Sequence, residues 1–99
     1  MVRGSTPTFT VLLPVNVSEI AALLVYFVQN DKLITTIRLD RMITDEKEAS
    51  FMLSEEETFA FSSDSNAEMQ MTLHTKGGQV LVSQIKKIPI RKKYPEEIL

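Results

Sequence analysis

The chain has 99 residues, of which 43% are hydrophobic and 24% charged, and its formal net charge is −2. This length and mixture are typical of a single globular domain and argue against a disordered chain. The chain contains no cysteine, which excludes disulfides, thiol catalysis and thiolate metal ligands and fits a reducing cytoplasm. The longest apolar stretch, Ile20 to Val28, has nine residues, far fewer than the roughly 20 that a membrane helix needs.

The charges are unevenly distributed along the chain. Residues 40–68 hold nine acidic residues against two basic ones, a balance of −7, whereas residues 76–93 hold six basic residues and no acidic one. The negative net charge argues against a nucleic-acid binder. The separation of the two blocks would suit head-to-tail contacts between copies, which build rings.

The first residues predict an extended arm over 1–7, followed by a strand. Gly, Ser, Thr and Pro interrupt the arm before any apolar run begins, so no secretory signal peptide is expected. Thr8 to Leu12 alternates polar and apolar residues, which places Phe9 and Val11 on one face of a half-buried strand. Pro14 ends this strand.

Residues 16–28 allow two interpretations. Asn16 with Glu19 could form a helix capping box, and a helix could continue from there. We favour a turn followed by a strand, because Leu24 to Val28 is rich in β-branched and aromatic residues and a helix there would be apolar all round. Since this strand is apolar on both faces, it is expected to be central in its sheet.

A hairpin is predicted next. Gln29 to Lys32 forms its turn, because Asn and Asp tolerate positive φ. The returning strand, Leu33 to Leu39, places four residues on one face, namely Leu33, Thr35, Ile37 and Leu39.

The middle of the chain predicts a loop, a strand and a short helix. Thr44 to Lys47 is polar enough for a surface loop, and Glu48 to Leu53 is a strand with Ala49, Phe51 and Leu53 inward. Ser54 with Glu57 forms a capping box, which predicts one helical turn near Ser54 to Thr58 that joins two strands across an end of the sandwich. After this turn Phe59 and Phe61 are expected to enter the core.

The last part of the chain predicts a second hairpin. Ala67 to Thr75 alternates with Met69, Met71 and Leu73 on one face, Lys76 to Gly78 forms the turn, and Gln79 to Ile90 is the last strand. In that strand Val80 and Val82 are expected to point inward. Residues 91–99 form a charged tail.

These elements predict an all-β protein, an immunoglobulin-like antiparallel β-sandwich of six to seven strands, with a small barrel as the alternative. The expected organisation is an extended arm over 1–7, one sandwich domain over 8–90 and the charged tail over 91–99.

Few side chains could carry chemistry. His74 is the single histidine, which excludes a multi-histidine metal site. On the polar face of an edge hairpin it is expected to be solvated and not to belong to a Ser-His-Asp arrangement. Glu55 to Glu57 lacks the alternating Asp/Asn pattern of a calcium loop and fits a charged first helical turn. Lys86 and Lys87 point to opposite faces of a strand, so they do not form one phosphate-binding patch. We expect no enzyme activity, cofactor, metal, nucleic acid, membrane or small-molecule substrate.

Three strings spread over nearly the whole chain belong together: RGSTPTFT from Arg3, FVQNDK from Phe27 and LSEEETF from Leu53. They resemble a family of short, uncharacterised structural-module proteins encoded in phages and prophages of Gram-positive bacteria, which typically opens with RGTTPT and carries QNGK and LTQEDTLKF further on. Asp31 replaces the usual glycine of the hairpin turn.

The resemblance implies a virion or tail-module protein that is made in the bacterial host cytoplasm and works by contact with copies of itself or with other particle proteins. The predicted interaction surface consists of charged residues and one tyrosine: Glu55, Glu56, Lys86, Arg91, Lys92, Lys93 and Tyr94. The alternative function is a small ligand-binding or carbohydrate-binding sandwich module, which would need an exposed aromatic cluster built from Tyr26, Tyr94 and one phenylalanine.

Overall fold

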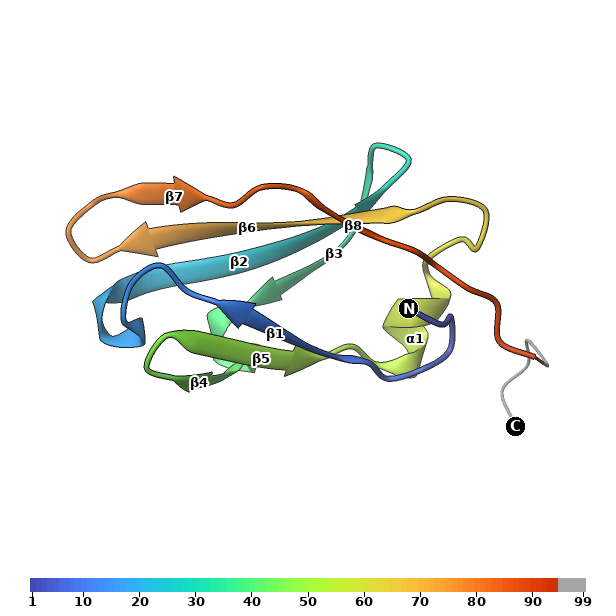
Figure 1. Ribbon diagram of the computed structural model, residues 1–99, viewed down its shortest axis with the longest axis horizontal. Coiled ribbons are helices and arrows are strands. Elements are labelled where there is room, and N and C mark those ends of the chain that lie inside the picture. Colours follow the sequence, from blue (N-terminus) through green and yellow to red (C-terminus); the bar gives the residue numbers. More distant parts are fainter. Residues whose placement is uncertain (95–99) are drawn as a thin grey trace.

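Two antiparallel sheets pack face to face in the computed structural model, which describes residues 1–94 (Figure 1). The first sheet has the order β1-β5-β4, with β1 Thr8–Leu12, β4 Ile43–Asp45 and β5 Glu48–Met52. The second sheet has the order β3-β2-β6-β7, and β8 also pairs with β6; its strands are β2 Ile20–Gln29, β3 Lys32–Arg38, β6 Ala67–Thr75, β7 Val80–Val82 and β8 Lys86–Ile88.

Three short helices connect the strands. They are the 3-10 helices η1 Val17–Glu19 and η2 Leu39–Arg41, and the α-helix α1 Glu55–Phe59, which runs between the two sheets at one end of the sandwich (Figure 1). Within residues 1–94 the longest helix is therefore α1 with five residues, so no helix there has the length and apolarity to cross a membrane.

The strand order is that of the immunoglobulin fold. That fold has the sheets ABED and CFG, and its variable type adds C′ beside C. When β1 is taken as strand B, the next strands in chain order become C, C′, D, E, F and G, and the two sheets read B-E-D and C′-C-F-G. The predicted immunoglobulin-like sandwich is confirmed. Its strands number eight rather than six to seven, and within residues 1–94 no strand occupies the place of strand A beside β1.

Four phenylalanine rings form the centre of the core. Phe27 lies edge-on to Phe9, Phe51 and Phe61, with ring centroids 5.4, 6.0 and 6.0 Å apart. Phe9 stacks on Phe51 at 5.6 Å. Such aromatic pairs contribute about 0.5–1.5 kcal/mol each beyond the burial of their area. The chain has no cysteine or tryptophan, so it lacks the inter-sheet disulfide and the buried tryptophan that are hallmarks of antibody domains.

The ambiguous segment after Pro14 forms a turn and then a central strand, as favoured. Asn16 caps η1 through its side-chain oxygen, which accepts a hydrogen bond from the Ser18 N–H at 3.0 Å. β2 then begins at Ile20 and pairs with β3 on one side and β6 on the other. Its buried residues Leu23, Val25 and Phe27 alternate along the strand.

The hairpin between β2 and β3 has a two-residue loop. Asn30 and Asp31 have φ of 53° and 62°, the left-handed conformation of a type I′ turn, which asparagine and aspartate adopt more readily than other non-glycine residues. A β-bulge follows, because Phe27 pairs with Thr35 while Val28 pairs with Leu33 and leaves Ile34 extra. The bulge turns Leu33 to the outer face, where it is 54% exposed, so the prediction that Leu33 shares one face with Thr35, Ile37 and Leu39 is wrong.

The predicted loop over Thr44 to Lys47 is partly a strand. β4 pairs with β5 through Asp45, and the turn between them uses a positive φ of 37° at Glu46. β4 is an edge strand of three residues whose side chains are all exposed, so its residues show no apolar alternation. The inward positions predicted on the next strand are confirmed, since Ala49, Phe51 and Leu53 are buried.

The last strand is interrupted, and its predicted facing is reversed. Leu81 pairs with the buried Leu73, which turns Leu81 inward and leaves Val80 and Val82 56% and 58% exposed. Three consecutive apolar residues fit either facing, so only the pairing register decides. Ser83 then ends the β7 ladder, because its Oγ accepts a hydrogen bond from the Met71 N–H at 2.9 Å.

Candidate functional site

The predicted interaction residues lie in three places. Glu55 and Glu56 are in the first turn of α1, Lys86 is on β8, and residues 91–94 follow β8. The N-terminal arm connects the first and last of these places. The N–H of Gly4 donates to Thr58 Oγ1 of α1 at 2.9 Å, and the N–H of Arg3 donates to the carbonyl of Arg91 at 2.9 Å.

The acidic first turn of α1 and the basic residues 91–93 therefore lie at the same end of the sandwich (Figure 1). Although these acidic and basic residues are far apart along the sequence, they do not lie at opposite ends of the molecule. Head-to-tail attraction between opposite ends would be weakened by this arrangement, because acidic and basic side chains lie at the same end.

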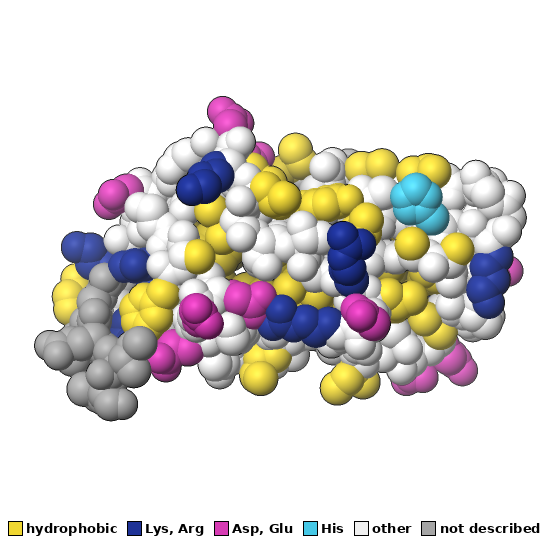
Figure 2. All heavy atoms as spheres, turned by 180° about the vertical axis from the view of Figure 1, so that it is seen from behind, with side chains coloured by type: hydrophobic (Ala, Val, Ile, Leu, Met, Phe, Trp, Pro, Cys, Tyr) yellow, Lys and Arg dark blue, Asp and Glu magenta, His cyan; other side chains and the backbone are white. Residues whose placement is uncertain are grey.

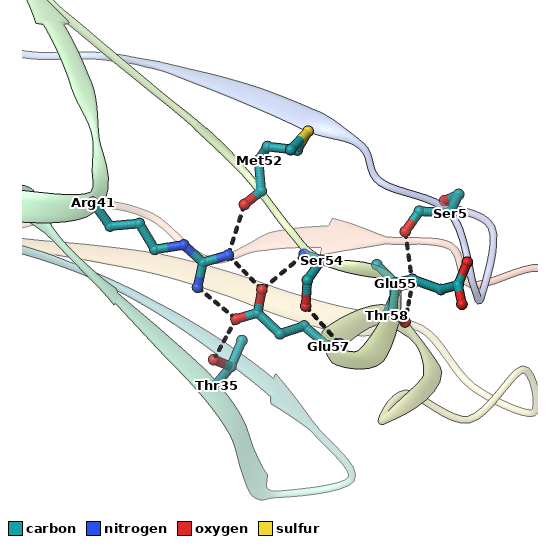
Figure 3. Close-up of polar contacts among 8 residues, drawn as sticks. All are labelled: Ser5, Thr35, Arg41, Met52, Ser54, Glu55, Glu57 and Thr58. Carbon is teal, nitrogen blue, oxygen red and sulfur yellow. Dashed lines mark hydrogen bonds and ion pairs between the residues drawn. The ribbon is translucent and has the colours of Figure 1, made fainter.

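A polar network that the sequence did not predict fastens α1 to η2 (Figure 3). Arg41 holds both carboxylate oxygens of Glu57, one of them at 2.7 Å, and also donates to the carbonyl of Met52 at 2.8 Å. Glu57 accepts a hydrogen bond from the Ser54 N–H at 2.8 Å and donates its own N–H to Ser54 Oγ at 3.1 Å, which completes the predicted capping box.

This network holds Glu57 ionised. The hydrogen bonds from Arg41, opposed by partial burial and helped by those from Ser54, lower the pKa of Glu57 from 4.5 to about 2. Both carboxylate oxygens of Glu57 accept hydrogen bonds from groups of the fold itself. The network therefore positions a helix and leaves no free group for chemistry.

The only imidazole of the chain lies away from any comparable network. His74 is exposed near the end of β6, opposite Val80 and Ala22. Among residues 1–94 no three His, Cys, Asp or Glu side chains lie close enough to hold a metal ion.

The aromatic side chains do not gather on one surface. Phe9, Phe27, Phe51 and Phe61 pack on one another in the core. Tyr26 is half-buried on β2, in a hollow it shares with Leu33, whereas Tyr94 follows β8 and is 86% exposed. Phe59 lies under Arg3, whose guanidinium carbon is 5.4 Å from the ring centroid. The carbohydrate-binding alternative stays a prediction, because residues 1–94 form no exposed aromatic cluster on which a sugar could stack.

The clearest unoccupied surface is the edge of the sandwich where β1 and the segment from β7 to β8 lie, which we call the open edge. Among residues 1–94, β1 pairs with β5 on one side and with no strand on its other side. Two adjoining hollows of about 480 Å³ each lie between β1 and that segment. Their walls are mainly apolar: Val11, Leu12, Leu13, Pro14, Met69, Met71, Leu73, Leu81 and Val82, with the polar Thr10, Ser83, Gln84 and Lys86.

The open edge differs from the opposite edge in charge. The outer strands there, β3 and β4, carry Lys32, Arg38 and Asp45, and Figure 2, which shows the molecule from behind, has charged side chains of both signs spread along that side. β1 has no charged residue at all. Charges on an edge strand prevent pairing with other chains, and β1 lacks this protection.

Comparisons with known proteins add little. No protein-family model and no curated protein matches the chain. A similar solved structure is that of extracellular domains 3–5 of Drosophila OTK, at 14% identity and a TM-score of 0.42, covering 93% of this chain and 31% of that chain. The chain thus spans about a third of that structure's length, and the assignment of the fold rests on strand order rather than on this likeness.

Proposed function

We propose that this chain is a structural or accessory protein of a larger particle and works by protein–protein contact at the open edge. The resemblance to phage and prophage proteins supplies the kind of particle: a virion or tail module assembled after synthesis in the host cytoplasm. The observation that carries the contact is the uncharged free edge of β1 beside two apolar hollows.

The exposed apolar side chains at this edge supply the driving force. Leu12 is 74% exposed, and Val82, which lines one of the same hollows, is 58% exposed. Covering one such side chain stabilises a contact by about 1.5–3 kcal/mol at most. Clustered exposed apolar residues mark interaction sites more often than isolated ones do.

Light scattering tests the proposal on the chain alone and on the chain co-expressed with the products of its flanking genes. We expect a mass above that of the monomer in at least one case, and the assembly should persist at high salt because apolar contact is not screened. Leu12→Lys should weaken it about tenfold. Ile43→Lys, an equally exposed apolar residue on β4, should leave it unchanged.

Two results would count against the function. A monomer in every mixture, at low and high salt, would remove the contact itself. Flanking genes that encode metabolic enzymes would contradict the assignment of the chain to a phage particle.

A further inference from the structure

We propose that the open edge is completed by strand addition: one extended segment of a partner polypeptide occupies the place of strand A, pairs with β1 and lays alternate apolar side chains into the two hollows. This inference rests on the proposed function and names the chemistry of the partner. It is a mode of recognition in which backbone hydrogen bonds supply affinity and side-chain pockets supply specificity.

The backbone of β1 provides the pairing surface. In an antiparallel ladder, residues alternate between those that bond to the partner strand and those that face away. The N–H of Leu13 donates to Lys47 at 2.8 Å, and the carbonyl of Pro7 accepts from Leu53 at 3.1 Å, so the odd-numbered residues bond to β5. The N–H and C=O groups of Thr8, Thr10 and Leu12 therefore point to the free side.

The second sheet provides a floor for the added strand. Leu81 and Val82 of β7 line the same hollow as Leu12, so the second sheet reaches past β1. A strand placed beside β1 would have Met71 and Leu81 beneath one of its faces. It would bury apolar side chains at every second position, the spacing that a strand presents to one face.

The position of the second sheet also decides whether a single extended strand or β1 of a second whole sandwich can pair with β1. If β1 of another copy paired antiparallel with β1, both second sheets would lie on the same side and β7 of each copy would enter the space of the other. We therefore assign one extended segment to that layer. Pro14, which has no N–H, ends the row of outward donors after Leu12, so the paired segment has about five to seven residues.

Charge defines the partner further. Among the residues up to Tyr94 that line the two hollows, Lys86 is the one charged side chain. It pairs with Met69, whose side chain lies on the inner face of β6, so its ammonium group is on the groove side. The segment that fits has apolar residues at alternate positions and an acidic residue near Lys86.

Synthetic peptides of about seven residues test the inference on the full chain. Each has Val, Leu, Ile or Phe at alternate positions, Thr between them and one Glu, and a scrambled peptide with the apolar residues grouped together is the control. We expect the alternating peptides at about 1 mM to slow hydrogen exchange of the Thr8, Thr10 and Leu12 amides about tenfold. The amide of Thr44, on the edge of β4, should exchange unchanged.

Lys86 gives a second readout that does not depend on folding. Lys86→Glu should weaken the Glu peptide about tenfold and favour a matched peptide carrying Lys. Protection of the same three amides by raising the concentration of the chain alone would show pairing with a second copy and would overturn the assignment of the segment to a separate partner polypeptide.

Strand addition is overturned if no alternating peptide protects these amides, or if the scrambled peptide protects them equally. If Leu12→Lys weakens assembly but no peptide protects these amides, the proposed function stands and strand addition is excluded. Absence of both protection and assembly would remove both.

Discussion

Arg41 and Glu57, sixteen positions apart, form a two-pronged ion pair that joins η2 to α1 and thereby connects the two sheets at their crossover (Figure 3). Local sequence places each residue in its own short helix. The pair converts a five-residue helix, which would not be stable alone, into a fixed part of the sandwich.

The ion pair makes part of the stability depend on pH. Because the folded pKa of Glu57 is about 2 against an ordinary 4.5, its contribution is complete above pH 4.5 and is lost as the pH falls towards 2. Glu57→Gln should cost about 1–2 kcal/mol at pH 7, a value reduced because Arg41 is 42% exposed. Urea unfolding at pH 7 and near pH 2 measures the difference, and Glu56→Gln is the matched control. A difference that stays constant over this range would contradict the assignment.

Gln29 is the buried polar residue that fastens the loop after α1. Its amide donates to the carbonyls of Ser62 and Ser65 at 2.8 Å each and accepts from the Ser62 N–H at 2.7 Å. Gln29→Leu should cost about 2–4 kcal/mol, since three backbone groups lose their partner. Thermal unfolding measures it, with the exposed Gln79→Leu as control. Equal melting temperatures for the two variants would show that water replaces the amide.

Thr58 holds the N-terminal arm to α1. Its buried hydroxyl accepts from the Gly4 N–H at 2.9 Å and donates to the carbonyl of Ser5 at 2.8 Å. Thr58→Val keeps the shape and removes both bonds, so we expect a loss of about 1–3 kcal/mol and faster exchange of the Gly4 amide. Thr58→Ser should retain most of the stability. The assignment fails if valine is tolerated as well as serine.

Gly4 is required by both its conformation and its neighbour. Its φ is +76°, and a Cβ atom there would lie 2.5 Å from Cζ of Phe59. Gly4→Ala should therefore destabilise the fold by about 2–4 kcal/mol. Gly77→Ala, where the nearest atom would be 3.8 Å away, should change little. Chemical denaturation of both variants compares them, and a silent Gly4→Ala would mean that the arm moves aside freely.

Local patterns predicted the elements whose causes are local. β1 and β6 begin and end at the expected residues, because strict alternation with one apolar face leaves little choice of facing. The capping box of α1 was readable because Ser54 and Glu57 are three positions apart and each side chain accepts a hydrogen bond from the other's backbone N–H. The hairpin at Asn30 and Asp31 was readable because few residues adopt left-handed φ.

Pairing between distant segments decided the rest. Leu33 faces outward because of a bulge opposite Phe27, and Val82 does so because Leu81 pairs with Leu73; neither cause is visible in the strand concerned. The partnership of Arg41 with Glu57 depends in the same way on a crossover between sheets.

By itself, the sequence determined the class of fold, since a period of two and four interior phenylalanines require paired sheets around one core. Only the tertiary structure decided that one edge stays open. That edge results from the offset between two stacked sheets and from the free side of β1, and the relative position of two sheets is a property that no single strand encodes.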